Sequence, residues 1–191
     1  MKVLAINSSA RKDGNTAILL NTVLGELNGE GIETELVQLA GQHIQGCMAC
    51  NKCFKKKDGR CAFEKDMLNE CLSKMVAAEG ILLGSPTYFS DVSANMRSLI
   101  ERGGLVSRAN KYMLKGKVGA GVIAVRRAGS IPAFNSLNLF FLYGQMIIPG
   151  SSYWNVGIGM NPGDVAEDTE GIQTMKDLGR NMAWLLKKLH G

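Results

Sequence analysis

The sequence predicts an α/β fold in which one parallel sheet carries helices on both faces, as a three-layer sandwich. Short apolar runs and amphipathic segments alternate five times along the 191 residues, and such alternation is typical of this class. The apolar runs are nearly continuous, as in strands that are buried on both faces. Hydrophobic residues make up 46% of the chain and charged residues 20%, so we expect a single domain over residues 1–191.

The first strand is predicted at Lys2–Asn7, where an apolar run leads directly into polar, turn-forming residues. An apolar stripe at helical spacing follows, and Asn15 or Thr16 is expected to cap that helix. The glycines within Gly29–Gly31 end it. Ile32–Leu39 then predicts the second strand.

The second half of the chain continues the alternation. Gly80–Gly84 predicts the third strand, Lys117–Val125 the fourth, and Met146–Ile148, bounded by Pro149, the fifth. Four further helices are predicted from apolar stripes. The first begins at Asp66 and carries Leu68, Cys71, Leu72, Met75 and Val76. The other three carry Met96, Leu99 and Ile100; Phe134, Leu137, Phe141 and Leu142; and Ile172, Met175, Met182, Leu186 and Leu189.

Right-handed crossovers place every strand-to-helix loop at the carboxyl edge of such a sheet, where ligands bind. The loops at 8–16, 40–63, 84–90 and 126–130 are all of this type. The loop at 40–63 contains most of the cysteines. We therefore expect the cysteines to share this edge with any cofactor that the other loops hold.

The first loop has the character of an anion site. Backbone N–H groups at a helix start are unsatisfied and favour negative charge, and Ser9, Asn15 and Thr16 add donors while Arg11 adds positive charge. The glycine patterns of dinucleotide-binding and Walker-type loops are absent, which favours a monophosphate. The alternative is a plain helix cap beside a solvent-exposed arginine.

Four of the five cysteines lie in one short stretch, residues 46–61, at Cys47, Cys50, Cys53 and Cys61. This spacing lets three thiolates converge from one turn and a fourth from another side, as an iron–sulfur cluster requires. The lysines and arginine around them, Lys52, Lys55, Lys56, Lys57 and Arg60, would favour the reduced cluster. A zinc site and a loop of free thiols are the alternatives. The fifth cysteine, Cys71, lies in a helical stripe and is expected in the core.

The net charge, the lengths of the apolar runs and the first residues argue against some functional classes. The net charge of +5 comes from scattered residues without a nucleic-acid-binding motif, so it favours acidic partners or phosphorylated dinucleotides. No apolar run approaches the ~20 residues of a membrane span. The first residues do not fit a signal peptide, so a cytoplasmic protein is expected. Clustered cysteines in that reducing compartment indicate metal or redox ligands.

Two segments together carry a family resemblance. Asn7–Thr16, followed by Gly84–Phe89 with its Ser-Pro-Thr-Tyr-Phe run, resembles the flavodoxin-like FMN reductase family. With the four cysteines of residues 46–61, the chain resembles the iron–sulfur flavoprotein branch of that family. The resemblance extends from the first strand through Trp154. It implies a sheet in the order 2-1-3-4-5, FMN as cofactor, a 4Fe–4S cluster on the cysteines, and a homo-oligomer.

The resemblance also implies roles for particular residues. The FMN phosphate maps onto Ser9, Arg11, Asn15 and Thr16. The flavin ring maps onto Pro86, Thr87, Tyr88 and Phe89, and onto Arg126, Arg127, Ala128 and Gly129 in the loop after the fourth strand; Tyr153 and Trp154 could pack over it in this subunit or its neighbour. Ser8 departs from the pattern, because relatives often have glycine there.

The implied function is an FMN-dependent oxidoreductase or electron-transfer flavoprotein that couples flavin to a 4Fe–4S cluster. NAD(P)H or a ferredoxin is the implied donor, and a quinone or a ferredoxin-type protein the redox partner. The alternatives are a cluster-free NAD(P)H-dependent FMN or quinone reductase, a flavodoxin-type carrier without its own substrate, and a flavin-free regulatory protein. No catalytic side chain is required, since the flavin ring takes the electrons itself, and His43 and His190 lie in no catalytic context.

Overall fold

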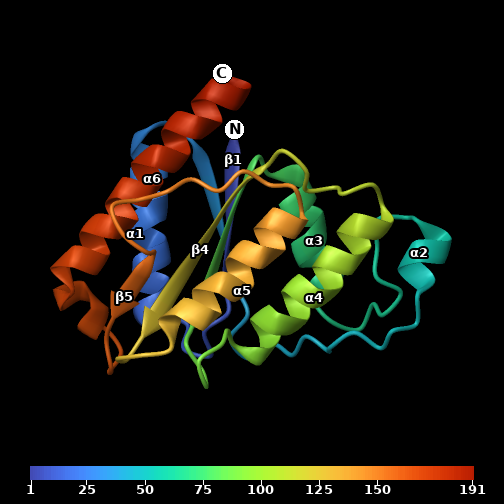
Figure 1. The fold of residues 1–191 in the computed structure, drawn as a ribbon, viewed down its shortest axis with the longest axis horizontal. Coiled ribbons are helices and arrows are strands. Elements are labelled where there is room, and N and C mark those ends of the chain that lie inside the picture. The colour runs from blue at the N-terminus through green and yellow to red at the C-terminus, as the bar shows by residue number, and fades with distance from the viewer.

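The computed structural model describes all 191 residues and contains one five-stranded parallel sheet. The strand order is β2-β1-β3-β4-β5, which confirms the predicted order (Figure 1). The strands are β1 (Lys2–Asn7), β2 (Glu33–Gln38), β3 (Gly80–Pro86), β4 (Val118–Val125) and β5 (Val156–Ile158).

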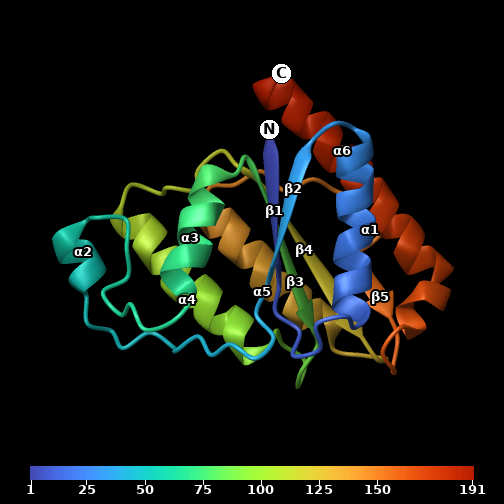
Figure 2. The ribbon, with the colours of Figure 1, turned by 180° about the vertical axis from the view of Figure 1, so that it is seen from behind.

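Helices cover both faces of the sheet, as the sequence predicts. One face carries α1 (Asn15–Gly29) and α6 (Thr169–His190), which lie side by side in Figures 1 and 2. The other face carries α3 (Leu68–Ala77), α4 (Ala94–Ala109) and α5 (Ser130–Tyr143). Two short helices complete the chain, α2 (Lys52–Lys56) in the cysteine loop and the 3-10 helix η1 (Asp164–Glu167) after β5. None of the helices is long and apolar enough to cross a membrane.

Strand β1 explains the continuous apolar runs. Leu4 and Ile6 pack into the core beneath α3, α4 and α5, whereas Val3 and Ala5 pack into the core beneath α1 and α6. Successive side chains of a strand point to opposite faces, so a strand between two helix layers must be apolar at every position. The close packing of α1 also requires Gly84 in β3, where an added Cβ would lie 2.5 Å from Leu20 Cδ1.

The predicted position of the fifth strand was wrong. Of Met146–Ile148, only Ile147 pairs with β4: it donates a backbone hydrogen bond to Lys117 and accepts one from Gly119, both of 2.9 Å. The chain then leaves the sheet at Pro149, and β5 forms at Val156–Ile158 beside Ile123–Val125. Proline has no N–H to donate to a ladder, which explains why the apolar run ends in a single bridge.

Candidate functional site

A pocket of about 230 Å³ opens at the carboxyl edge of the sheet. It is formed by the loops after β1, β3, β4 and β5. Eight of the residues that the sequence assigned to a cofactor lie in its wall: Ser9, Arg11, Asn15, Thr16, Pro86, Thr87, Tyr88 and Arg126. Gly14, Ala124, Val125, Gly159 and Met160 complete it.

The start of α1 faces this pocket without a side-chain cap. The N-cap residue is Gly14, in an extended conformation, so the prediction that Asn15 or Thr16 caps the helix was wrong. The backbone N–H groups of Asn15 and Thr16 have no acceptor within the chain, as expected for the first turn of a helix. These donors and the helix dipole favour an anion at this end of the pocket.

The Asn15 side chain is hydrogen-bonded to the loop that follows β5. Its side chain donates to the carbonyl of Asn161 and accepts from the N–H of Gly163, both at 2.9 Å. The loop that follows β5 is thereby held against the start of α1. A Cβ at Gly159 would lie 2.7 Å from Asn15 Nδ2, so this contact requires glycine. Sequence reasoning missed Gly159 and Met160, although the closely spaced glycines Gly157, Gly159 and Gly163 were a usable signal.

The loop after β3 ends in a tight turn. Tyr88 and Asp91 exchange two backbone hydrogen bonds of 2.9 and 3.0 Å, and between them Phe89 and Ser90 adopt left-handed φ values of 48° and 60°. The Phe89 side chain is fully exposed at the tip and is not part of the pocket wall. Burial raises the pKa of Asp91, but hydrogen bonds from Ser136 and the Val92 N–H outweigh this and keep its pKa below the ordinary value.

The loop after β4 contributes less to the pocket than the resemblance implies. Arg126 lines both the pocket and a shallow neighbouring hollow, whereas Arg127 and Ala128 line only the hollow. Gly129 has a φ of +86°, and a Cβ there would lie 2.6 Å from Ser90 Oγ. The close approach made by Gly129 is therefore to the turn of the β3 loop.

The four clustered cysteines line a separate cavity of about 240 Å³. Eleven of its 15 lining residues are hydrophobic, and none of the 15 also lines the pocket at the carboxyl edge. The loop carries α2 to the outer side of α4, well away from β4 and β5 (Figures 1 and 2). The prediction that the cysteines share the edge with the other loops was thus wrong, because contacts with α4 draw the loop sideways.

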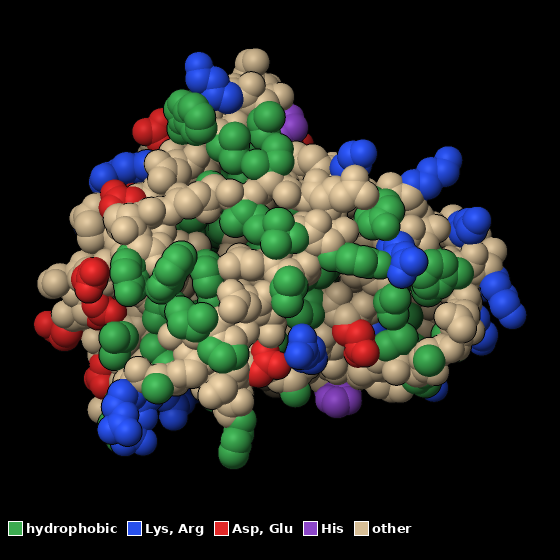
Figure 3. All heavy atoms as spheres, in the orientation of Figure 1, with side chains coloured by type: hydrophobic (Ala, Val, Ile, Leu, Met, Phe, Trp, Pro, Cys, Tyr) green, Lys and Arg blue, Asp and Glu red, His purple; other side chains and the backbone are tan.

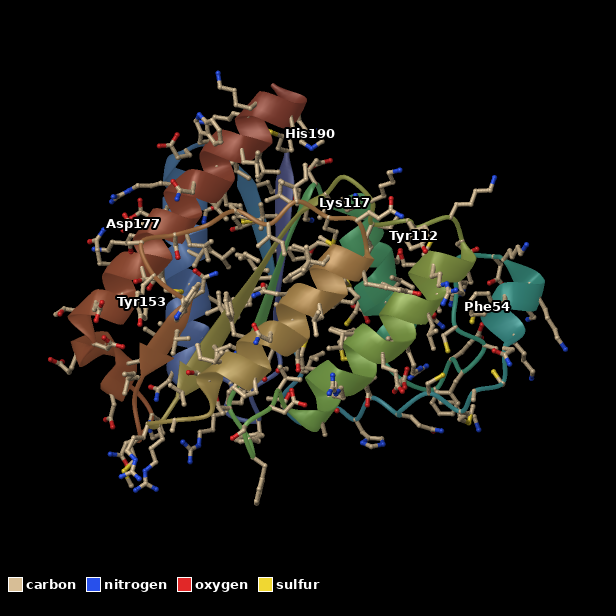
Figure 4. All side chains as sticks on the ribbon, in the orientation of Figure 1. Phe54, Tyr112, Lys117, Tyr153, Asp177 and His190 are labelled. Atoms are coloured by element: carbon tan, nitrogen blue, oxygen red, sulfur yellow. The ribbon has the colours of Figure 1, made fainter.

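Side chains of α4 hold this loop at several points. Glu101 accepts a hydrogen bond of 3.1 Å from the N–H of Cys47, and Arg102 donates one of 3.2 Å to the sulfur of Cys61. Further along α4, the Arg108 guanidinium lies 6.0 Å from the ring centre of Phe54, a cation–π contact. Figure 4 shows Phe54 on α2, at the outer end of the molecule.

Two residues within the cysteine run have a left-handed backbone conformation. Ala49 and Asn51 have φ values of 51° and 54°, and the Ala49 N–H donates to the sulfur of Cys47 at 3.4 Å. Burial raises the pKa of the Cys53 thiol. No three side chains of the Cys, His, Asp and Glu types lie close enough to hold a single metal ion.

A family model of the NADPH-dependent FMN reductases matches residues 1–161. The chain belongs to this family. As a member of the NADPH-dependent FMN reductases, it is an FMN-dependent oxidoreductase with a flavodoxin-like fold.

Individual relatives agree with this membership. The FMN reductase chain is 38% identical to an iron–sulfur flavoprotein of Methanocaldococcus jannaschii, over 98% of both chains. The solved structure of RosB, with a bound 8-demethyl-8-formylriboflavin-5′-phosphate intermediate, matches 99% of this chain and 80% of its own with a TM-score of 0.78 and 17% identity. A flavodoxin from the domain Archaea matches 98% and 99% with a TM-score of 0.62 and 16% identity.

Two other groups of this FMN reductase lie outside the edge pocket. Tyr153 and Trp154 pack against each other with ring centres 5.8 Å apart and line a third cavity beside α5, so neither borders the pocket of its own chain. His190 lies in the last turn of α6, at the end of the molecule opposite the pocket (Figure 4).

Proposed function

We propose that the chain binds FMN in the pocket at the carboxyl edge and carries electrons from NAD(P)H or a ferredoxin to a quinone or a ferredoxin-type protein. Family membership supports FMN as the cofactor, and the pocket at the carboxyl edge supports this location for it. When bound, FMN accepts a hydride or two electrons and releases them singly. The chain's own residues bind it, orient it and exclude water.

The observation that carries this proposal is the uncapped start of α1. The N–H groups of Asn15 and Thr16 lack acceptors, and Arg11 lies in the same pocket wall. A phosphate accepts charge-assisted hydrogen bonds from such donors, each worth about 1.5–3 kcal/mol. We therefore assign the FMN phosphate to this end of the pocket, with Ser9, Arg11 and Thr16 beside it and Asn15 bracing the wall.

The β3 loop suits the flavin ring. The Thr87 hydroxyl is buried without a hydrogen-bond partner and lies in the pocket wall, where a polar ring edge would satisfy it. Pro86 and Tyr88 offer apolar surface beside it. Arg126 at the rim, with Arg127 next to it, supplies positive charge that stabilises the reduced, more negative ring. We place Phe89, Ala128 and Gly129 around the entrance of the pocket, near the flavin ring.

The cysteine cavity fits a thiolate-bound 4Fe–4S cluster. All four sulfurs line one largely apolar space, and the left-handed residues Ala49 and Asn51 turn the backbone as in the N–H concavities common at Fe–S sites. We propose the cluster on Cys47, Cys50, Cys53 and Cys61, where it would exchange single electrons.

The surface around the cavity suggests the kind of partner. Basic side chains gather around α2 and below the carboxyl ends of β4 and β5 (Figure 3), and Lys52, Lys55, Lys56, Lys57 and Arg60 are all exposed. An acidic ferredoxin-type protein would be steered toward this surface. Clustered free thiols persist in a reducing compartment, so we place the protein in the cytoplasm. We also propose a homo-oligomer, since Leu139, Leu142 and Tyr143 expose apolar surface on α5.

Anaerobic purification with flavin, iron and sulfide quantified together tests this function. The proposal predicts about one FMN and about four iron and four sulfide ions per chain. Flavin without iron would instead identify the cluster-free reductase, and protein without flavin would contradict the proposal altogether. Turnover with NADPH, NADH and reduced ferredoxin, each with a quinone acceptor, then identifies the donor.

A further inference from the structure

Cys61, the cysteine separated from the other three, is fixed by α3. Its N–H donates to Asn69 Oδ1 at 2.8 Å, and its carbonyl accepts from Asn69 Nδ2 at 2.9 Å. The Asn69 side chain lies in the core, with 7% of the residue exposed. One amide group therefore holds both backbone hydrogen-bonding groups of Cys61.

Arg102 reaches the same cysteine from α4. It is 2% exposed, and its Nη2 atom donates to Cys61 Sγ at 3.2 Å and to the Phe63 carbonyl at 3.0 Å. Its Nη1 atom donates to the Gln45 carbonyl at 2.9 Å and pairs with the Asp66 carboxylate. The guanidinium thus ties both ends of the cysteine loop to one point on α4.

The ion pair between Nη1 and Asp66 explains why a buried arginine is tolerated, but it does not explain why Nη2 donates to a sulfur. Nη2 points at a sulfur in the wall of the cavity, and Arg102 and Cys61 both line that cavity. The sulfurs of Cys47 and Cys53 accept hydrogen bonds from backbone N–H groups only. Cys61 is therefore the one cysteine of the set whose sulfur accepts from a charged side chain.

We propose that Arg102 is a positioning residue that holds Cys61 as the preset ligand and, through its hydrogen bond to Sγ, raises the reduction potential of a cluster bound there. The inference rests on the proposed cluster. A donor to a ligand sulfur stabilises the reduced, more electron-rich cluster more than the oxidised one, and hydrogen bonds to sulfur are among the factors that set cluster potentials. Holding the fourth sulfur in place also slows the escape of iron.

The test compares Arg102→Lys with Arg97→Lys, the same substitution on the same helix, in the anaerobically purified protein. The lysine keeps the positive charge and the ion pair with Asp66, but it has no second nitrogen that could donate to the sulfur. Arg97 lies on the same helix, pairs with Asp91 at 3.0 Å and is not part of the cavity wall. Three quantities are measured: the cluster potential by redox titration, the rate of iron loss to a chelator, and hydrogen exchange of the segment 61–66.

For Arg102→Lys we expect a lower potential, iron loss about tenfold faster, and faster exchange of residues 61–66, with FMN content unchanged. Arg97→Lys should match the wild type in potential. A folded Arg102→Lys protein with wild-type potential and iron loss would overturn the inference while leaving the cluster in place.

Two further outcomes are separable. If Arg102→Lys does not fold, as judged by lost FMN, the double variant Arg102→Gln/Asp66→Asn removes both buried charges and is held to the same expectations. If the wild type holds FMN but no iron, the proposed cluster fails. Hydrogen exchange then still tests the positioning role, and unchanged exchange of residues 61–66 in the variant would refute it.

Discussion

The hydroxyl of Ser93 donates a hydrogen bond of 2.8 Å to the hydroxyl of Ser8, and both residues are buried. Ser8 follows β1, and Ser93 is the N-cap of α4, where its oxygen accepts from the Met96 N–H. The bond therefore joins the loop that we assign to the FMN phosphate to the helix that holds the cysteine loop. It also gives a physical role to Ser8.

Removing this bond should loosen the start of α4. We expect Ser93→Ala to lower the free energy of unfolding by about 1–3 kcal/mol, because the helix loses its cap and the Ser8 hydroxyl loses its donor. Ser98→Ala, on the same helix and without a hydrogen bond of its own, should change it by less than about 0.5 kcal/mol. Urea unfolding of both variants measures the difference, and equal midpoints would contradict the role of Ser93.

The phosphate assignment predicts a loss of FMN affinity. Arg11→Ala should raise the dissociation constant of FMN about 10–100-fold, as expected when one charge-assisted hydrogen bond is lost, and Thr16→Ala should weaken binding to a smaller extent. Lys12→Ala is the control, since Lys12 is exposed and lies outside the pocket wall. Fluorescence titration of the apoprotein gives the constants. Unchanged affinity in Arg11→Ala and Thr16→Ala would remove the assignment.

Phe89 is expected to serve function rather than stability. Its side chain is fully exposed and its backbone is left-handed, a conformation that costs a non-glycine residue about 1–2 kcal/mol. Phe89→Gly should therefore leave the melting temperature equal or higher while it reduces turnover with NAD(P)H. Thermal unfolding and steady-state rates are the measurements. A destabilised variant with full activity would show the reverse.

Cysteine substitutions should separate cluster from flavin. Cys50→Ser should remove the iron and leave FMN content unchanged, since the two cavities share no residue. Cys71→Ala is the matched control, because Cys71 is buried in the core and burial raises the pKa of its thiol to about 12. The iron content per chain is the measurement. An iron content in Cys50→Ser equal to that of the wild type would contradict the proposed cysteine ligands.

Asp66 should make stability depend on pH in acid. Burial raises its pKa, but hydrogen bonds from Arg102 and from the N–H groups of Gln45 and Leu68 outweigh this and hold the pKa below its ordinary value of 3.8. Because the folded pKa is the lower one, the stabilisation is complete above the unfolded pKa and is lost as the pH falls through the folded pKa.

Asp66→Asn should accordingly be destabilised by about 3–5 kcal/mol at pH 7, where the wild type has the full ion pair and the variant leaves Arg102 unpaired. The gap between the two proteins should narrow as the pH approaches 3 and below. Urea unfolding at several pH values measures this gap. A gap that does not change with pH would show that Asp66 does not carry the dependence.

The periodicity of the chain was enough to predict the sheet, its two helix layers and the loops at the carboxyl edge. A strand such as Lys2–Asn7 that is buried on both faces must be apolar at every position, and this requirement is visible in the sequence itself. The same holds for the four cysteines, whose spacing is a property of the sequence. Edge strand β5 escaped prediction because three residues at the rim of a sheet bury too little surface to leave a pattern.

Residue types and their spacing therefore determined the fold, the family and the two sets of residues that we propose as cofactor ligands. Only the tertiary structure decided that Asn15 braces the loop after β5, that Phe89 projects from its turn, and that Arg102 meets Cys61 across the cavity. It also decided that the cysteines lie beside α4 and away from the edge pocket. The physical reason is that these contacts join residues far apart in the chain, and hydrogen bonds between such residues leave no local pattern in the sequence.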